Sequence, residues 1–328
     1  MINRKNKHCI IGAGPCGLAA ARNFSKYGLE FDAFEMHTNV GGLWDIESPT
    51  STMYESAHLI SSKTKMQYEE FKFCKETADY PHHSEMRKYF HDFAKEFDLH
   101  THYKFETRID KAVRDTDGNW EVTYTNLRTA ESETAVYGGL ITANGIFSAP
   151  NLPKFKGQEN FKGKIIHSSE YKTAKIFEGK SVLIIGAGNS GCDIAVDACH
   201  RARCVDISVR RGYYFIPKYI FGKPSDTVGA KTTILPKFLR KRTDKYILKM
   251  FTGDPVNFGF PKPDYDLFQS HPIVNSLILH HLGHGDISVK ADVDYLNGNT
   301  VYFKDGTERE YDLVLCATGY KLNYPFLD

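Results

Sequence analysis

The hydrophobic positions of the chain form two kinds of segment: short apolar runs typical of buried strands, and longer segments with helical spacing. The apolar run at residues 7–11 passes directly into a glycine-rich turn and an alanine-rich segment, GAGPCGLAAAR. Strand, glycine turn and helix in this order form the unit that holds the pyrophosphate of a dinucleotide. In this turn, the residues predicted to contact the dinucleotide are Gly12, Gly14, Cys16 and Gly17.

The same succession returns later in the chain, where the apolar run KSVLII precedes GAGNSG and a second helical segment. Gly186 permits the tight bend, Gly188 lets the backbone approach a phosphate, and Gly191 lets the helix pack onto its strand. The start of the helix adds unpaired N–H groups and a positive dipole end, so Asn189 and Ser190 are also predicted to contact the nucleotide. One such motif is weak support for a dinucleotide site, but two in one chain are much more specific.

The residues at the end of the next strand differ in charge between the two units. The strand predicted at 30–34 ends on Glu35, and the strand predicted at 205–209 ends on Arg210 and Arg211. A carboxylate accepts hydrogen bonds from both ribose hydroxyls and repels a 2′-phosphate, whereas guanidinium groups bind a 2′-phosphate. The first unit is therefore predicted to bind FAD or NAD, and the second NADPH. Because the two signals imply different nucleotides, FAD in the first unit is the most economical assignment.

A short loop, VGGLW, follows the acidic strand end. Paired glycines permit close backbone approach or a positive φ angle, and the tryptophan supplies a flat face. The purely structural interpretation of this loop is a tight turn with a tryptophan in the core. Next to a flavin site, we expect Gly42, Leu43 and Trp44 to lie against the flavin ring or its pyrophosphate.

The remaining pattern predicts a helix at 84–99 with an aromatic stripe facing the core, a strand at 120–125 and a buried strand at 140–150. The basic stretch at 235–251 has an apolar stripe, for which a solvated helix face is favoured over peripheral membrane binding. Strands are expected within 286–311, followed by a buried strand that ends on the segment ATGY.

The expected fold class is α/β, with two Rossmann-like dinucleotide-binding domains and the NADPH domain inserted into the FAD domain. Residues 1–155 form the first segment of the FAD domain, 156–290 the NADPH domain with a helical insertion, and 291–328 the return to the FAD domain.

Composition and charge narrow the classes of function. Of the 328 residues, 41% are hydrophobic and 25% are charged, as in an ordinary globular protein. The net charge is +2 and the chain has no basic tail, so a nucleic-acid partner is not expected. No apolar run approaches the ~20 residues of a membrane-spanning helix. The seven scattered cysteines favour reduced thiols and a cytoplasmic location.

Two further patterns carry less weight. Cys199 and Cys204 have the spacing of a redox pair, but they lie at the far end of the second predicted helix, away from any flavin. His280, His281 and His284 include a pair at helical spacing, without a neighbouring glutamate or cysteine. We therefore predict neither dithiol chemistry nor a metal site.

The segment FKGKIIHSSEY, between the two units, has Phe161, Gly163, His167 and Tyr171 in the spacing FxGxxxHxxx(Y/F). Together with the two glycine turns, the GGLW loop and the closing ATGY, it makes nearly the whole chain resemble the class B flavin-dependent monooxygenases, in particular the flavin-containing monooxygenase family. Baeyer–Villiger relatives usually end this motif in Trp-Pro or Trp-Asp. Tyr171 therefore favours the branch that oxidises heteroatoms.

The resemblance implies that NADPH reduces FAD and that the reduced flavin reacts with O₂ to give a C4a-(hydro)peroxyflavin. A small soft nucleophile containing nitrogen or sulfur then takes one oxygen atom. The partners are thus a small-molecule substrate and O₂. Thr318 and Gly319 are expected to close over the flavin. Oligomeric state is left open, and a homodimer is compatible with the sequence.

The resemblance also places His58 and Ile60 near the nicotinamide, and His167 and Tyr171 at the domain junction in a positioning role. Many family members have an asparagine where this chain has Ile60, which cannot make the same hydrogen bonds. Ser61 or its neighbour is expected to substitute, or the oxygenating intermediate is shorter-lived. Family members also continue well past ATGY, so we expect either a fragment of a longer protein or a site without a lid.

Two alternatives therefore accompany the predicted monooxygenase. One is an uncoupled NADPH oxidase that releases H₂O₂, or an oxygenase of carbonyl compounds. The other is a non-catalytic nucleotide-binding or interaction protein. No sequence motif identifies the substrate, because specificity resides in loops.

Overall fold

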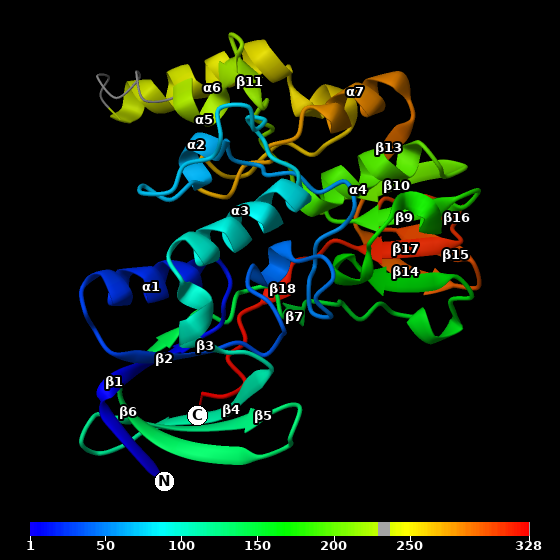
Figure 1. Cartoon of the computed structure of the whole chain (residues 1–328). Helices are drawn as coiled ribbons and strands as arrows, with labels where there is room; N and C mark the ends of the chain where they lie inside the picture. The colour runs from blue at the N-terminus through cyan, green and yellow to red at the C-terminus, as the bar shows by residue number, and fades with distance from the viewer. Residues whose placement is uncertain (229–236, 328) are drawn as a thin grey trace.

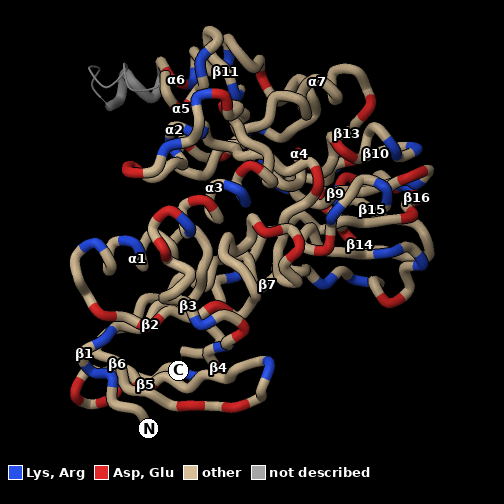
Figure 2. The backbone as a smooth tube through the Cα atoms, viewed as in Figure 1, with Lys and Arg blue, Asp and Glu red and all other residues tan. Residues whose placement is uncertain are grey.

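The computed structural model describes residues 1–228 and 237–327. Two β-sheets lie at opposite ends of the molecule, each with helices against it, and two connecting segments cross between them (Figure 1). Lys and Arg alternate with Asp and Glu along both units, as the near-neutral net charge suggests (Figure 2). The fold is therefore α/β with two sheet-centred units, which confirms the predicted fold class.

The first sheet has the strand order β3-β2-β1-β6-β5-β4. Its first four strands are parallel, and β5 and β4 extend it as an antiparallel meander. The strands are β1 (Ile2–Ile11), β2 (Phe31–Phe34), β3 (Tyr103–Lys104), β4 (Thr107–Arg114), β5 (Trp120–Asn126) and β6 (Ser132–Thr142). The strand predicted at 140–150 thus ends at Thr142, and only the two-residue β7 (Ala149–Pro150) follows.

Helices α1 (Pro15–Lys26) and α3 (His83–Glu96) pack on the parallel part of the first sheet. The aromatic stripe of α3 is buried there, as predicted, with Tyr89, Phe90 and Phe93 in one core cluster with Leu18 of α1. A second core cluster covers the opposite face of this sheet.

The second sheet has the order β13-β10-β9-β17-β8 and is parallel throughout. Every residue of its central strand β9 is buried, because core clusters cover both faces of the sheet. The strands are β8 (Lys164–His167), β9 (Ser181–Ile185), β10 (Cys204–Ser208), β13 (Ile287–Lys290) and β17 (Leu313–Cys316). A small antiparallel sheet packs beside it, made of β14 (Val293–Asn297), β15 (Thr300–Phe303) and β16 (Glu308–Glu310).

The C-terminal part of the chain departs from the expected division, in which residues 291–328 return to the first domain. Strand β17 instead inserts between β9 and β8 of the second sheet. Only the residues after it reach the first unit: β18 (Tyr320–Lys321) pairs with β7, and the Ala112 amide donates to the Phe326 carbonyl at 2.6 Å. The apolar pattern of β17 indicates a buried strand, but it does not encode which sheet receives it.

The remaining helices pack on the second unit or form the layer at the top of Figure 1. Helix α6 includes most of the predicted basic stretch, although residues 235–236 of that prediction lie outside the described part of the chain. Among the described helices, none is long and apolar enough to span a membrane. These elements are α2 (Lys63–Met66), α4 (Asn189–Cys199), β11 (Tyr219–Ile220), β12 (Lys223–Pro224), α5 (Ser225–Val228), α6 (Lys237–Thr252) and α7 (Leu277–His284).

Candidate functional site: two glycine cradles joined by a double linker

The first glycine turn follows β1 and leads into α1, as predicted. Gly12 has a φ angle of +102°, and a Cβ at this position would lie 2.5 Å from the carbonyl oxygen of Ala143. A Cβ on Gly17 would lie 1.8 Å from the carbonyl oxygen of Gly12. Only glycine fits either position, because the blocking atoms belong to the backbone. The first turn of α1 leaves N–H groups without an intrahelical partner, which suits a phosphate.

The glycine pair of the VGGLW loop lies directly against this turn. The Gly41 amide donates to the carbonyl oxygen of Ala13 at 2.9 Å, and a Cβ on Gly42 would lie 2.9 Å from the Cα of Gly14. Gly42 begins the short 3-10 helix η1 (Gly42–Trp44), so the loop and the turn form one continuous wall.

The other predicted residues of this wall have different environments. The carbonyl oxygen of Leu43 accepts a hydrogen bond from the Ser51 hydroxyl. Trp44 is partly buried and packs against the core cluster that includes the aromatic residues of α3. Cys16, in the first turn of α1, is an exposed free cysteine. The structure therefore brings the loop and the glycine turn together, with Cys16 at the open side.

Glu35 is held rigidly at the end of β2. Its side chain is buried, with 8% of the residue exposed. One carboxylate oxygen accepts from the Ala13 amide at 2.7 Å, and the other accepts from the His37 amide at 2.9 Å. Each oxygen keeps a further lone pair, so the carboxylate can still accept hydrogen bonds from ribose hydroxyls.

The second glycine turn repeats the geometry of the first at the end of β9. Gly186 has a φ angle of +100°, and its Cβ would lie 2.7 Å from the carbonyl oxygen of Ala317. A Cβ on Gly191 would lie 2.0 Å from the Gly186 carbonyl oxygen. Gly188 differs, because a Cβ there would meet no heavy atom within 4 Å. It is therefore the glycine that leaves open space for an approaching phosphate.

The start of α4 is fastened to the segment before α7. The Asn189 side chain accepts from the Val274 amide at 2.8 Å, and the Asn275 side chain donates to Asp193 at 2.5 Å. Asn189 is thus engaged with the protein, while Ser190 is exposed at the helix start.

Arg210 and Arg211 are both exposed just after β10. The Arg211 guanidinium donates to the Ser270 hydroxyl at 3.3 Å and lies over the rings of Tyr213 and Tyr265, at 5.6 and 5.3 Å from their centroids. The basic strand end is therefore accessible to an anionic ligand, in contrast to the buried Glu35.

Each glycine turn, together with the start of the helix that follows it, is called a cradle below. The two cradles are connected through the paired segments that cross between the units. The segment after β6 begins at Ala143, which backs the first turn, and the segment after β17 begins at Ala317, which backs the second. These segments meet where β7 pairs antiparallel with β18. The Thr318 hydroxyl donates to the Asn151 carbonyl oxygen at 2.6 Å.

His167 fixes the second linker segment. Its Nδ1 accepts the Ser169 amide at 3.1 Å, so Nε2 carries the proton and donates to the Gly319 carbonyl oxygen at 3.0 Å. Burial lowers the pKa of the ring, and the imidazole is therefore neutral near pH 7. Gly319 has a φ angle of +78°, a conformation that favours glycine.

The residues predicted at the nicotinamide and at the domain junction have different environments. Tyr171 is buried within the core of the second unit, where its hydroxyl donates to Asp197 at 2.7 Å. His58 is exposed and contacts the His82 ring, while Ile60 and Ser61 are half-buried in the chain before α2. The neighbouring Ser62 is fully buried and hydrogen-bonded to Asp226 and Thr64.

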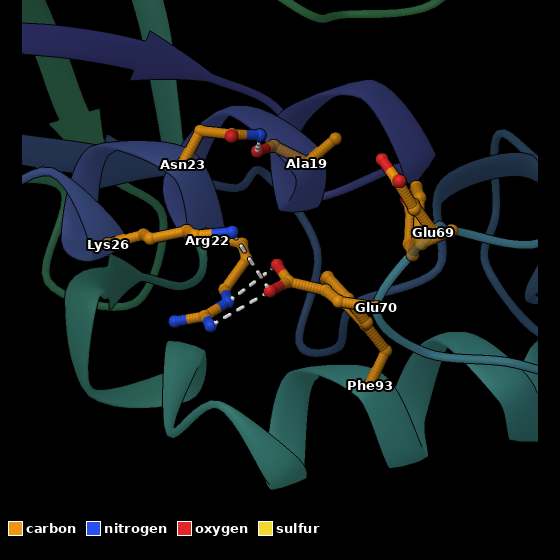
Figure 3. A pocket seen from close by; sticks show the side chains of 8 residues that line it. Ala19, Arg22, Asn23, Lys26, Glu69, Glu70 and Phe93 are labelled. Atoms are coloured by element: carbon orange, nitrogen blue, oxygen red, sulfur yellow. Dashed lines mark hydrogen bonds and ion pairs between the residues drawn. The ribbon is translucent and has the colours of Figure 1, made fainter.

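A surface pocket of about 450 Å³ lies away from both cradles, beside the exposed face of α1 (Figure 3). There Arg22 and Lys26 point toward Glu70, and Arg22 donates two hydrogen bonds to its carboxylate at 2.9 and 3.1 Å. The charges of Arg22, Lys26 and Glu70 are thus paired with one another. It contains neither glycine turn, so we do not assign it to the dinucleotides.

All seven cysteines are free. Burial, followed by the charge of Asp286, raises the pKa of the Cys199 thiol to about 11, which makes it a poor nucleophile at neutral pH. This agrees with the prediction that Cys199 and Cys204 do not act as a redox pair.

The family model described as flavin-binding monooxygenase-like matches residues 5–328. Flavin-containing monooxygenase 3 of Oryctolagus cuniculus is 35% identical over 340 residues, a match that covers 98% of this chain and 63% of the relative. The chain thus spans a little under two thirds of that protein.

Two solved structures share the fold. S-allyl-L-cysteine S-oxygenase from Allium sativum has a TM-score of 0.70 and 20% identity, covering all of this chain (100%) and 65% of the other. An oxidized steroid monooxygenase bound to NADP has a TM-score of 0.70 and 19% identity, covering 97% and 72%.

Proposed function

This chain belongs to the flavin-binding monooxygenase-like family, and we propose that it is an FAD-dependent NADPH monooxygenase. Its substrate would be a small soft nucleophile containing nitrogen or sulfur. The observation that carries the proposal is the pair of glycine cradles with opposite charges at their strand ends. Among the structures with this fold is one named as a sulfur oxygenase, which supports heteroatom oxidation.

The first cradle fits FAD. Gly12 and Gly17 leave backbone where any side chain would collide, and the α1 start offers N–H groups to the pyrophosphate. Glu35 would accept the ribose hydroxyls, since its carboxylate is already oriented by two backbone amides. Gly14, Gly42 and Trp44 line the same wall. When bound, the flavin supplies the redox chemistry that activates O₂ once NADPH has reduced it.

The second cradle fits NADPH. Gly188 leaves open space in front of the α4 start, where backbone N–H groups and the helix dipole attract the pyrophosphate. Arg211, assisted by Arg210, would bind the 2′-phosphate with charge-assisted hydrogen bonds. The protein thereby selects the phosphorylated nucleotide in one site and disfavours it in the other.

The residues of the FxGxxxHxxx(Y/F) motif act through positioning. His167, neutral and hydrogen-bonded to Gly319, would hold the linker so that Thr318 and Gly319 stay beside the cofactor. Tyr171 supports α4 from within the core through Asp197. Neither side chain is placed to exchange a proton with a substrate, and oxygen transfer to an amine or sulfide requires no protein nucleophile.

The direct test is turnover by the purified protein. We expect a yellow preparation that consumes NADPH and O₂ and forms the S-oxide of a small thioether or the N-oxide of a tertiary amine, each added as a defined substrate. A colourless protein that does not consume NADPH would contradict the proposal and support a non-catalytic nucleotide-binding role.

A second candidate, an NADPH oxidase that releases H₂O₂, is favoured by one observation. Ile60, at the position where the family resemblance implies an asparagine, has a side chain that cannot hydrogen-bond. The Ser62 amide donates to Asp226, and the buried Ser62 hydroxyl is already hydrogen-bonded to Thr64. Ser61 is therefore the hydroxyl that could substitute. We expect oxygenated product to exceed H₂O₂ in the wild type and Ile60→Asn to raise that ratio further. Equimolar NADPH consumption and H₂O₂ release at saturating substrate would instead identify an oxidase.

Two further properties complete the proposal. The seven free cysteines support a cytoplasmic location. A homodimer remains our hypothesis for the oligomeric state, which sedimentation of the purified protein would test.

A further inference from the structure

Among the described residues outside the two cradles, one cluster of metal-ligating side chains joins elements that are distant in sequence. Cys199 ends α4, His200 follows it, and His281 lies on α7, which packs against α4. One ligand atom from each of the three residues lies within 4.8 Å of the other two. The sequence predicted no metal site because no cysteine lies near the histidines at 280–284, but the fold supplies that cysteine from α4.

We propose that Cys199, His200 and His281 bind one divalent transition-metal ion, with Zn²⁺ as the best match. A thiolate and two imidazoles are the ligands that zinc prefers, and three protein ligands with one water complete a tetrahedron. This inference is independent of the proposed flavin chemistry.

The geometry requires only local adjustment. Ligands of one tetrahedral zinc lie roughly 3.3–3.7 Å apart, given the usual zinc–sulfur and zinc–nitrogen bond lengths. The cluster therefore needs to contract by about 1 Å. His200 is exposed, with its ring edge-on to that of His281 at 5.2 Å between centroids. The Cys199 thiol makes one hydrogen bond, to the Val196 carbonyl oxygen at 3.0 Å.

The surroundings of the cluster also suit a cation. Asp286 lies 2.9 Å from Nδ1 of His281, an arrangement that fixes the ring and leaves Nε2 as the ligand. A carboxylate behind a ligating histidine is a common feature of zinc sites. The cluster also lies at the C-terminal end of α4, where the helix dipole is negative.

The position of the site indicates a structural rather than a catalytic ion. Its ligands lie at one end of α4 and the second glycine turn at the other, about 16 Å away along an 11-residue helix. The ion would clamp α7 to α4. The segment just before α7 also holds the start of α4, through Val274 and Asn275. Metal binding is therefore expected to stiffen the helix that carries the cradle.

Co²⁺ is a suitable probe, because thiolate coordination gives it a charge-transfer absorption band. Untagged protein, stripped with a chelator, should bind one equivalent of Co²⁺ with this band and release it on addition of Zn²⁺. Cys199→Ser should abolish the band. His200→Asn, His281→Asn and Asp286→Asn should each weaken binding by at least about tenfold.

Matched controls separate this site from adventitious binding. Cys204→Ser and His280→Asn change the same residue types nearby without removing a proposed ligand, and should leave the Co²⁺ titration unchanged. Zn²⁺ should raise the unfolding temperature by about 5 °C in the wild type and not in Cys199→Ser. Absence of the band in the wild type, its persistence in Cys199→Ser, or equal loss in Cys204→Ser would overturn the proposal. His200→Asn changes an exposed residue, so weaker Co²⁺ binding with an unchanged unfolding temperature of the metal-free protein would report on the lost ligand itself.

Discussion

The two glycine cradles share a backbone plan and differ in how their selective groups are held. In both, the first glycine of the turn has a φ angle near +100°. The third glycine of the motif lies on the following helix and packs against the carbonyl oxygen of the first. Glu35 of the first cradle is buried and fixed by two backbone amides, whereas Arg210 and Arg211 of the second are exposed. The selective group of the first cradle is therefore preorganised, whereas those of the second are exposed and would complete the proposed contacts only when the nucleotide binds.

This difference suits a tightly held cofactor in one site and a nucleotide that must enter and leave in the other. A rigid acceptor loses little entropy on binding and supports a long residence time. Exposed guanidinium groups attract an anionic ligand, and salt weakens this attraction. Substitution of the buried Glu35 should therefore affect both folding and flavin retention, whereas substitution of the exposed Arg210 or Arg211 should affect nucleotide choice alone.

The largest effect is expected from Gly17→Ala. The added Cβ would lie 1.8 Å from a backbone carbonyl oxygen, which cannot move without breaking the turn. We expect a loss of about 3 kcal/mol in the free energy of unfolding and loss of bound flavin. Gly188→Ala, at the middle glycine of the second turn, is the control: a Cβ there meets open space, and the change should cost within about 1 kcal/mol. Equal losses in urea unfolding would contradict the packing argument.

Glu35→Gln should have the next largest effect. Both carboxylate oxygens accept backbone N–H groups, so the amide NH₂ of glutamine would face one donor and leave it unpaired. This costs about 1–3 kcal/mol in the free energy of unfolding. Loss of the charged acceptor for the ribose hydroxyls should separately lower FAD affinity ~10–100-fold in equilibrium binding. Glu30→Gln, at an exposed position just before β2, serves as the control. Unchanged affinity in Glu35→Gln would show that the carboxylate does not bind the ribose.

Arg211→Ala should change nucleotide preference without changing stability. The exposed guanidinium makes one weak hydrogen bond, at 3.3 Å, so its loss should leave the unfolding temperature unchanged. The KM for NADPH should rise at least ~10-fold, since a charge-assisted bond to a phosphate is worth about 1.5–3 kcal/mol. The KM for NADH is the internal control and should not move. A parallel rise for both nucleotides would argue against 2′-phosphate recognition.

The smallest effect concerns pH. Burial lowers the pKa of His167 below its usual value of 6.5, so unfolding takes up a proton as the pH falls below that value. The contribution of His167 to stability is complete at higher pH and declines as the pH drops from about 6.5 toward the folded-state pKa. His167→Asn should therefore flatten the fall in unfolding free energy between pH 7.5 and 5.5. His83 and His91, whose pKa values are also lowered by burial, account for any remaining slope.

The sequence located most of the elements that build the cradles. The glycine turns, the strands before them and the helix with Tyr89 and Phe93 are local features, and local spacing predicts them well. The placement of β17 could not be predicted, because the apolar pattern of a strand does not specify which sheet it joins. The cluster of Cys199 with His281 was missed for the same reason: the two residues meet only through packing of α4 on α7.

The central claim is that one cradle binds a nucleotide with a free ribose and the other a 2′-phosphorylated one, and that the two react with each other. Anaerobic reduction of the bound flavin, followed by the loss of its visible absorbance, tests this most directly. The account predicts that NADPH reduces the flavin at least ~10-fold more efficiently than NADH at equal concentration. Equal efficiency for the two nucleotides, or a retained flavin that neither reduces, would contradict it.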